Sequence, residues 1–242
     1  MSITSNSEPQ IVLSSRRRFL QRSTALTLVG GSAAVLSGAL GRVASAKPDN
    51  EAMEGLLYPK ASQKGNFVSI RQHENDHVAF LVKALGTNAR PKPTFQNLEQ
   101  THFFQFVNVS QALENTGVGA YLGAAPAIDD PAYLAAAGSI FAIEARHAGY
   151  LNTFNRDPIT GNVADMVLED DSNASFEAPL TAAEVAADAG GFIASLNGGP
   201  AVDYSSTRSP DNDIAILNFA LALEYLEAEF YNINVPKFYK HT

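Results

Sequence analysis

Apolar residues recur at helical spacing in four long stretches of the chain. In residues 68–85, Val78, Leu81, Val82 and Leu85 fall on one face of a helix. The same spacing predicts three further long helices, over residues 103–122, 132–154 and from about 211 or 213 to 232. No stretch alternates polar and apolar residues over the length of a strand. The pattern therefore predicts an all-α fold, a bundle of four helices.

The segments between these helices carry turn and capping residues. Asp130 and Pro131 are placed as the N-cap and the first residue of the third helix. Residues 155–211 are rich in Gly, Pro, Asp and Ser. Within them, the capping box of Thr181 and Glu184 predicts one short helix that ends near residue 196. We therefore expect a long irregular connection before the last helix.

Residues 1–46 contain the three parts of an export signal in order. An arginine run, Arg16-Arg17-Arg18-Phe19-Leu20, precedes an uncharged stretch from about residue 25 to 40 and the cleavage site Ala44-Ser45-Ala46. The run resembles the twin-arginine export signal. Because about 16 apolar residues are short for a bilayer span, we expect cleavage, with an N-terminal anchor as the alternative. Residues 47–242 would then form one domain, periplasmic or extracellular, without stable membrane insertion.

The net charge and the absence of cysteine exclude several classes of binding site and catalysis. The chain has 17 Lys and Arg against 25 Asp and Glu, a net charge of -8. Loss of residues 1–46 removes five arginines and Glu8, which leaves 12 basic and 24 acidic residues and a net charge of -12. This acidity argues against nucleic-acid binding. With no cysteine, disulfides, thiolate metal sites and thiol nucleophiles are excluded, so a metal would bind to imidazole and oxygen.

Two of the predicted long helices carry a Glu-x-x-His motif. Glu74 and His77 lie on the first, and Glu144 and His147 on the third. A spacing of three places the carboxylate and the imidazole on one face, one turn apart. A carboxylate-bridged two-metal site uses this motif twice, together with one Glu from each of the two remaining helices.

The remaining helices offer Glu114 and Glu224. Glu114 and Glu144 lie 15 residues on either side of Asp129, so an antiparallel hairpin places both roughly 22 Å from the turn. Their neighbours are apolar or small, and a buried Glu or His is costly unless it pairs or binds a cation. Metal ligation is therefore the leading interpretation, and a hydrogen-bonded core pair is the alternative.

The fourth helix offers more than one carboxylate. Glu224 shares a face with Leu217 and Leu221, which favours it as the ligand. Glu227 lies one turn further on the same side, as an alternative ligand or an outer partner. Glu229 points away from this face and is expected to be solvated.

Two tyrosines and three histidines lie near this pattern. Tyr121 and Tyr231 follow Glu114 and Glu224 by seven residues, two helical turns. They could donate hydrogen bonds to ligand oxygens from a second shell, or be ordinary core tyrosines with the hydroxyl at the rim. The other histidines are expected to lie at the surface, turned away from the site: His73, His102 and His241.

Two Glu-x-x-His helices with two Glu helices resemble the ferritin-like superfamily of di-iron and di-manganese proteins. More narrowly, four strings of the chain resemble the ferritin-like family that includes plant desiccation-related proteins and exported bacterial relatives. They are Leu-Asn-Phe-Ala-Leu-Ala-Leu-Glu-Tyr-Leu-Glu-Ala-Glu-Phe-Tyr (217–231), Val-Ala-Phe-Leu-Val-Lys-Ala-Leu-Gly (78–86), Gly-Val-Gly-Ala-Tyr-Leu-Gly-Ala-Ala (117–125) and Ile-Glu-Ala-Arg-His-Ala (143–148). The resemblance covers about residues 65–232. In that family the first of these strings normally precedes the first Glu-x-x-His helix, so the chain looks circularly permuted. The long connection at 155–211 could return this helix in cis or exchange it in a homodimer.

The resemblance implies a ferritin-like four-helix bundle that binds two iron or manganese ions. Glu74 and Glu144 would bridge the ions, and Glu114 and Glu224 would be terminal ligands, with one imidazole for each ion. Hard oxygen ligands with one nitrogen suit iron or manganese; zinc would also bind, without redox chemistry.

The function expected from this resemblance is an exported metal protein. Its reaction, if it is an enzyme, is left open between oxidation of the metal by dioxygen or peroxide and disproportionation of peroxide. The alternative is a non-enzymatic stress or desiccation protein. In that case the helical bundle would be the functional unit, and the metal would be structural or absent. A storage cage is disfavoured, because the connection at 155–211 would obstruct the packing of a shell.

Overall fold

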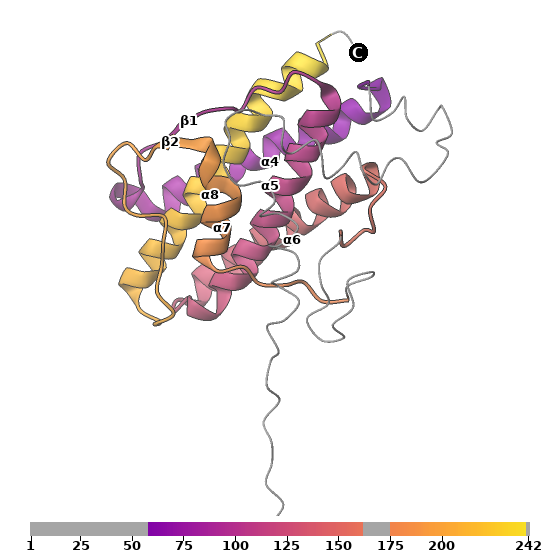
Figure 1. The fold of residues 1–242 in the computed structure, drawn as a ribbon. Coiled ribbons are helices and arrows are strands. Elements are labelled where there is room, and N and C mark those ends of the chain that lie inside the picture. Colours follow the sequence, from indigo (N-terminus) through magenta and orange to yellow (C-terminus); the bar gives the residue numbers. More distant parts are fainter. Residues whose placement is uncertain (1–57, 162–174, 241–242) are drawn as a thin grey trace, which may run out of the picture. The chain divides into compact units, whose positions relative to one another are not determined.

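The computed structural model describes residues 58–161 and 175–240, so the expected export signal and His241 lie outside the described residues (Figure 1). Four long helices dominate this part of the chain, which confirms the all-α fold. They are α4 (Ala61–Leu85), α5 (Phe103–Ala124), α6 (Pro131–Phe154) and α8 (Pro210–Phe238). Among the described residues, no helix is both long and apolar enough to cross a membrane.

The helix boundaries follow local signals. The Asp130 side chain accepts a hydrogen bond from the backbone N–H of Ala132, and Pro131 opens α6, as the capping residues predict. Helix α8 continues beyond the expected end at residue 232. The Asn234 side chain donates to the backbone oxygen of Leu98 and accepts from the N–H of Gln100, so the added turns are fixed to the chain that precedes α5.

Short elements lie in the connections between the long helices. They are the 3-10 turns η2 (Gly86–Asn88), η3 (Ala125–Ala127) and η4 (Gly190–Phe192), the helix α7 (Ala182–Ala189) and the strands β1 (Thr94–Phe95) and β2 (Ile193–Ser195). Strands β1 and β2 pair antiparallel, with Thr94 opposite Ser195. Strands of two and three residues are too short for an alternating pattern, which is why the sequence predicts none. The capping box of Thr181 and Glu184 opens α7, which ends at Ala189, earlier than expected.

The long helices form two antiparallel pairs, α4 with α8 and α5 with α6. Asn75 and Asn232 exchange side-chain hydrogen bonds, whereas Arg90, just after α4, bonds Asn218 near the start of α8. Asp213, in the first turn of α8, accepts from the backbone N–H groups of the turn between α5 and α6. In this structure of a single chain the last helix packs against α4 and α5; its exchange in a homodimer stays a prediction.

The core consists of two apolar clusters with a buried polar layer between them. The first cluster is rich in aromatic residues and includes Phe67, Phe106 and Phe230. The second cluster includes Leu81, Ile140 and Leu217. The polar layer contains four glutamates, each with a fully buried side chain: Glu74, Glu114, Glu144 and Glu224. Burial of several carboxylates is costly unless each finds a partner, so this layer is where chemistry is expected.

The connection before α7 crosses α5 at two glycines. The backbone N–H of Leu180 donates to the carbonyl oxygen of Gly119 at 2.8 Å. A Cβ atom at Gly123 would lie 1.8 Å from the backbone oxygen of Leu180. The crossing therefore requires glycine in α5, two residues before and two residues after Tyr121.

Candidate metal centre

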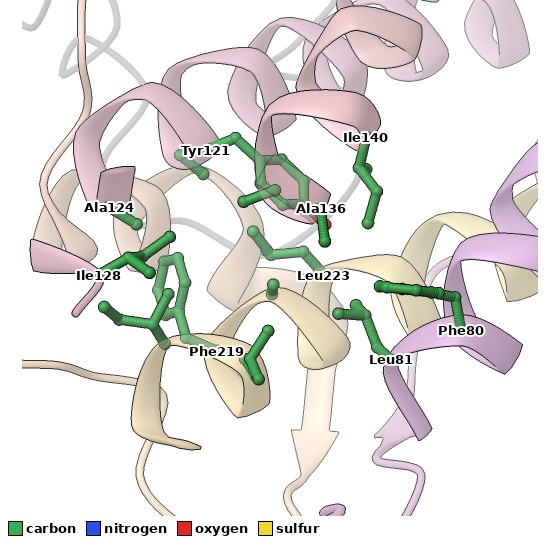
Figure 2. A pocket seen from close by; sticks show the side chains of 14 residues that line it. Phe80, Leu81, Tyr121, Ala124, Ile128, Ala136, Ile140, Phe219 and Leu223 are labelled. Carbon is green, nitrogen blue, oxygen red and sulfur yellow. The ribbon is translucent and has the colours of Figure 1, made fainter. Parts of the chain in front are cut away.

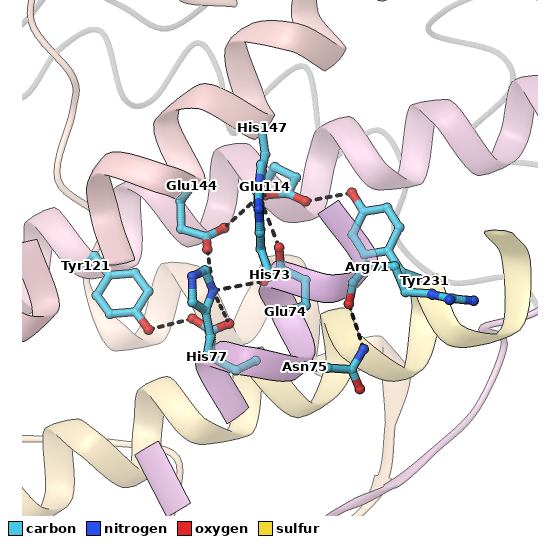
Figure 3. Close-up of polar contacts among 11 residues, drawn as sticks. Arg71, His73, Glu74, Asn75, His77, Glu114, Tyr121, Glu144, His147 and Tyr231 are labelled. Carbon is cyan, nitrogen blue, oxygen red and sulfur yellow. Dashed lines mark hydrogen bonds and ion pairs between the residues drawn. The ribbon is translucent and has the colours of Figure 1, made fainter. Parts of the chain in front are cut away.

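The structure brings the six expected ligands together from all four long helices. All of them except Glu224 are labelled in Figure 3. They form two groups of four, and within each group one ligand atom per residue lies within 4.8 Å of the others. The first group is Glu74, His77, Glu144 and Glu224; the second is Glu74, Glu114, Glu144 and His147. Glu74 and Glu144 belong to both groups, the positions that bridging ligands would occupy.

The first group surrounds one nitrogen of His77. Its Nδ1 atom lies 3.2 Å from Oε2 of Glu74 and 3.1 Å from Oε1 of Glu144. Oε2 of Glu224 lies 3.2 Å from the same nitrogen. The His77 side chain is 12% exposed, so this half of the centre has some access to solvent.

The second group has the same form around His147. Its Nδ1 atom lies 3.0 Å from Oε1 of Glu74 and 3.1 Å from Oε2 of Glu114. Oε2 of Glu144 is further away, at 4.0 Å. The His147 side chain is 6% exposed, so this half is the more enclosed one.

The shared carboxylates have oxygen atoms without a hydrogen-bond donor. Both oxygens of Glu144 and Oε1 of Glu74 are fully buried and accept no well-aligned hydrogen bond among the described residues, although Oε1 of each lies within 3.1 Å of an imidazole nitrogen. A buried oxygen without a partner costs free energy, and a divalent cation would satisfy several such oxygens at once. The buried carboxylate oxygens would therefore be better satisfied by a bound metal ion than by the hydrogen bonds that the surrounding residues offer.

The pKa values of the centre show how charge is balanced before a cation binds. Burial lowers the pKa of each imidazole, but the carboxylates around His77 and His147 outweigh it and raise both pKa values to about 10. Burial would raise the pKa of Glu74, but hydrogen bonds from the two imidazoles lower it. Burial and then the charge of Glu74 raise the pKa of Glu144 well above its ordinary value. Both imidazoles therefore carry a proton near neutral pH that a cation would have to displace, and the raised pKa of Glu144 favours its neutral form.

The two tyrosines donate to the terminal carboxylates crosswise. The hydroxyl of Tyr121 on α5 donates to Oε1 of Glu224 on α8 at 2.5 Å. The hydroxyl of Tyr231 on α8 donates to Oε1 of Glu114 on α5 at 2.6 Å. Each tyrosine thus holds the carboxylate of the facing helix, rather than the one two turns away on its own helix.

The expectation that His73 turns away from the site is wrong. Nδ1 of His73 lies 2.9 Å from Nε2 of His147, and the two rings are stacked within 8° of parallel. His73 and His77 are four residues apart on α4 and therefore share a face. This four-residue spacing indicates that His73 lies on the same side of α4 as His77. The Glu-x-x-His motif includes Glu74 and His77 but not His73, so the motif alone does not identify His73.

The remaining acidic candidates on α8 differ in environment. Glu227 is 3% exposed and belongs to neither group of four, although its Oε1 and Oε2 of Glu144 would each lie 3.5 Å from a Cβ atom placed at Gly117. Burial and the charge of Glu114 raise its pKa well above the ordinary value. Glu229 pairs with Lys92 away from the centre, as its position predicts. His102 is exposed at the start of α5, also as expected.

Comparison with known proteins identifies the fold. A family model described as a ferritin-like domain matches residues 39–156 and 212–242, and leaves out most of the irregular connection. No curated protein and no solved structure matches the chain. The permuted order of the helices stays a prediction. Because the family model covers more than half of the chain, and the described helices are those of an all-α bundle, the protein belongs to the family of ferritin-like domains.

Proposed function

We propose that the protein binds two iron or manganese ions between its four long helices. Glu74 and Glu144 would bridge the ions, and His77 with Glu224 and His147 with Glu114 would complete the two halves. The observation that carries the proposal is the pair of overlapping ligand groups, since both include the same two carboxylates. Carboxylate oxygens with one imidazole for each ion suit iron or manganese, and zinc would also bind.

The bound ions would supply the electrons for a reaction with dioxygen or peroxide. The residues of the chain would prepare the centre for it. Tyr121 and Tyr231 hold the terminal carboxylates in place, and His73 orients His147. The partial exposure of His77 supports entry of a small molecule on its side. Oxidation of the metal and disproportionation of peroxide are both compatible with this arrangement.

A second candidate function is non-enzymatic stress or desiccation protection, with the bundle itself as the functional unit. One observation favours it. Without a cation, the raised pKa values of His77, His147 and Glu144 allow protons to balance the buried carboxylates. Such proton uptake would allow the bundle to fold without a metal.

We also propose that residues 1–46 export the protein by the twin-arginine route and are then removed. A protein carried in the folded state would take up its metal before it crosses the membrane. N-terminal sequencing of the protein from the cell envelope or medium tests this proposal. A mature chain that begins at Lys47 is expected, and an intact N-terminus on exported protein would contradict cleavage.

Metal analysis of the purified mature protein tests the proposed centre. Two equivalents of iron or manganese are expected, with loss of both in the double variant Glu144→Ala/His147→Ala. Glu229→Ala is the matched control, since Glu229 lies on α8 away from the centre. Circular dichroism shows whether each variant keeps its helices. Metal content near zero in the folded wild-type protein after reconstitution would exclude the dinuclear centre and favour the second candidate.

A further inference from the structure

An apolar cavity lies beside the polar layer, on the side of the second core cluster (Figure 2). All four long helices line it, with Phe80, Tyr121, Ile140 and Phe219 among the larger side chains. Five alanines also line the wall and leave the space open: Ala120, Ala124, Ala136, Ala137 and Ala220. The cavity measures about 20 Å³, counted as the positions that the centre of a water molecule can take.

The size of the cavity limits its occupant to a very small molecule. A volume of roughly 10–15 Å³ by this measure admits one water molecule. The cavity is therefore large enough for a diatomic molecule and too small for an alkyl chain or a ring. Phe80 is 44% exposed and Ala136 is partly exposed, so a small molecule can reach the rim between α4 and α6.

The chemistry of the wall selects an apolar occupant. Among the lining side chains, the only polar atom is the hydroxyl of Tyr121, which already donates to Glu224. A buried water needs two to four polar partners, and a cavity lined by alkyl and aromatic groups stays dry. Hydrogen peroxide, with two hydroxyl groups, would lose its hydrogen bonds there. Dioxygen has none to lose.

The cavity shares a wall with the candidate metal centre. The ring of Tyr121 lines the cavity, and its hydroxyl bonds a terminal carboxylate of the first ligand group. On α4, Phe80 follows His77 by three residues, and on α6 Ile140 precedes Glu144 by four. On each of these helices the cavity is thus about one turn, some 5 Å, from a ligand.

We propose that this cavity is a binding site for dioxygen, next to the metal centre. The binding of a small apolar molecule follows from the cavity alone. The delivery of dioxygen as oxidant rests on the proposed function. It distinguishes dioxygen from peroxide, whereas the geometry of the metal centre is compatible with both oxidants. Dioxygen would enter through the cavity, and peroxide would reach the centre past the partly exposed side chain of His77.

Xenon, an apolar probe of similar size, tests the binding step. Crystals of the protein under xenon pressure are expected to show xenon in the cavity, with or without metal. The variant Ala137→Leu fills the space and should exclude xenon, and Ala136→Leu at the rim repeats the test at a more tolerant position. Ala135→Leu is the matched control, because Ala135 is exposed on the same helix and does not line the cavity. A wild-type cavity without xenon would overturn the proposal, whatever the metal content.

Oxidation kinetics test the delivery step. In the iron-loaded protein, Ala137→Leu and Ala136→Leu should raise the apparent KM for dioxygen several-fold and leave oxidation by peroxide and the metal content unchanged. An unchanged KM for dioxygen in variants that exclude xenon would overturn delivery through the cavity. If the wild-type protein takes up xenon but neither binds metal nor reacts with dioxygen, the proposed function fails and the binding of a small apolar molecule stands.

Discussion

Nδ1 of His73 lies 2.9 Å from Nε2 of His147, on the side of the His147 ring opposite the carboxylates. This contact leaves Nδ1 of His147 to face Glu74 and Glu114. A neutral imidazole carries one proton, and when His147 places it on Nε2 toward His73, its Nδ1 lone pair is free for a cation. Nε2 of His77 makes no such contact with the described residues, so the two halves of the centre are not equivalent.

The first prediction concerns this contact. His73→Ala should weaken metal binding in the half that contains His147, by about 10- to 100-fold, since outer partners of ligating imidazoles typically have effects of this size. Competition with a fluorescent chelator would measure the two affinities separately. Gln72→Ala, at the exposed neighbouring position, serves as the control. Equal affinities in His73→Ala and the wild type would show that the contact does not orient the ligand.

A second prediction concerns the crosswise tyrosines. Tyr121→Phe and Tyr231→Phe each remove a donor from a buried carboxylate and should lower the free energy of unfolding of the metal-free protein by about 1–3 kcal/mol. Urea denaturation would measure the loss. Tyr133→Phe is the control, because Tyr133 is partly exposed and outside the centre. Midpoints and slopes equal to those of the control would mean that these hydrogen bonds add nothing to stability.

The third prediction is the pH dependence of the metal-free fold. The pKa values of His77 and His147 are about 10 in the folded state, against an ordinary value of 6.5. Because these values are raised, their contribution to stability is complete below pH 6.5 and is lost as the pH rises toward 10. The melting temperature should therefore fall across this interval. The double variant His77→Gln/His147→Gln should lose most of this slope, and an equal slope in the variant would contradict the assignment.

Metal binding should release these protons, which is the fourth prediction. At pH 7 both imidazoles carry a proton that a cation must displace, so about two protons or more should leave as the centre fills. Titration calorimetry in buffers with different heats of ionisation counts them. Affinity should accordingly rise with pH by up to about 100-fold per unit between pH 7 and 9. Release of fewer than one proton would show that the imidazoles are neutral before metal binds.

The six residues of the ligand groups were predictable because short-range rules position them. The Glu-x-x-His spacing places each carboxylate beside its imidazole on one helix face, whatever the rest of the fold does. Glu114 and Glu144 meet because a short turn joins α5 to α6, so equal distances along the chain become equal depths in the bundle. Glu224 follows from the apolar stripe that it shares with Leu217 and Leu221.

The partners of the centre depend on how the helices pack, and sequence spacing does not contain that information. A spacing of seven places Tyr121 two turns from Glu114, but only the packing of α5 beside α8 shows that its hydroxyl reaches Glu224. Glu224 and Glu227 are three residues apart on one side of α8, and the apolar stripe favours Glu224 without assigning a role to Glu227. The packing assigns both roles, because Tyr121 and His77 contact Glu224, whereas Glu227 lies toward Gly117.

The crossing of α5 by the connection before α7 gives the last prediction. A methyl group at Gly123 would lie 1.8 Å from the backbone oxygen of Leu180, which cannot move without breaking the hydrogen bond from Leu180 N–H to Gly119. Gly123→Ala should therefore destabilise the protein by about 1–3 kcal/mol or more. Gly138→Ala is the matched control, since no atom lies within 4 Å of its added Cβ, and alanine should stabilise α6 there by about 0.5–1 kcal/mol.

Thermal unfolding of the two variants would show whether Gly123→Ala lowers the melting temperature and Gly138→Ala raises it. Metal content provides a second readout, because the crossing at Gly119 and Gly123 flanks Tyr121, which holds Glu224. Displacement of the connection in Gly123→Ala should shift Tyr121 and lower the affinity of the half that contains Glu224, with Gly138→Ala unaffected. Destabilisation with unchanged affinity would mean that the connection stabilises the bundle without positioning the centre.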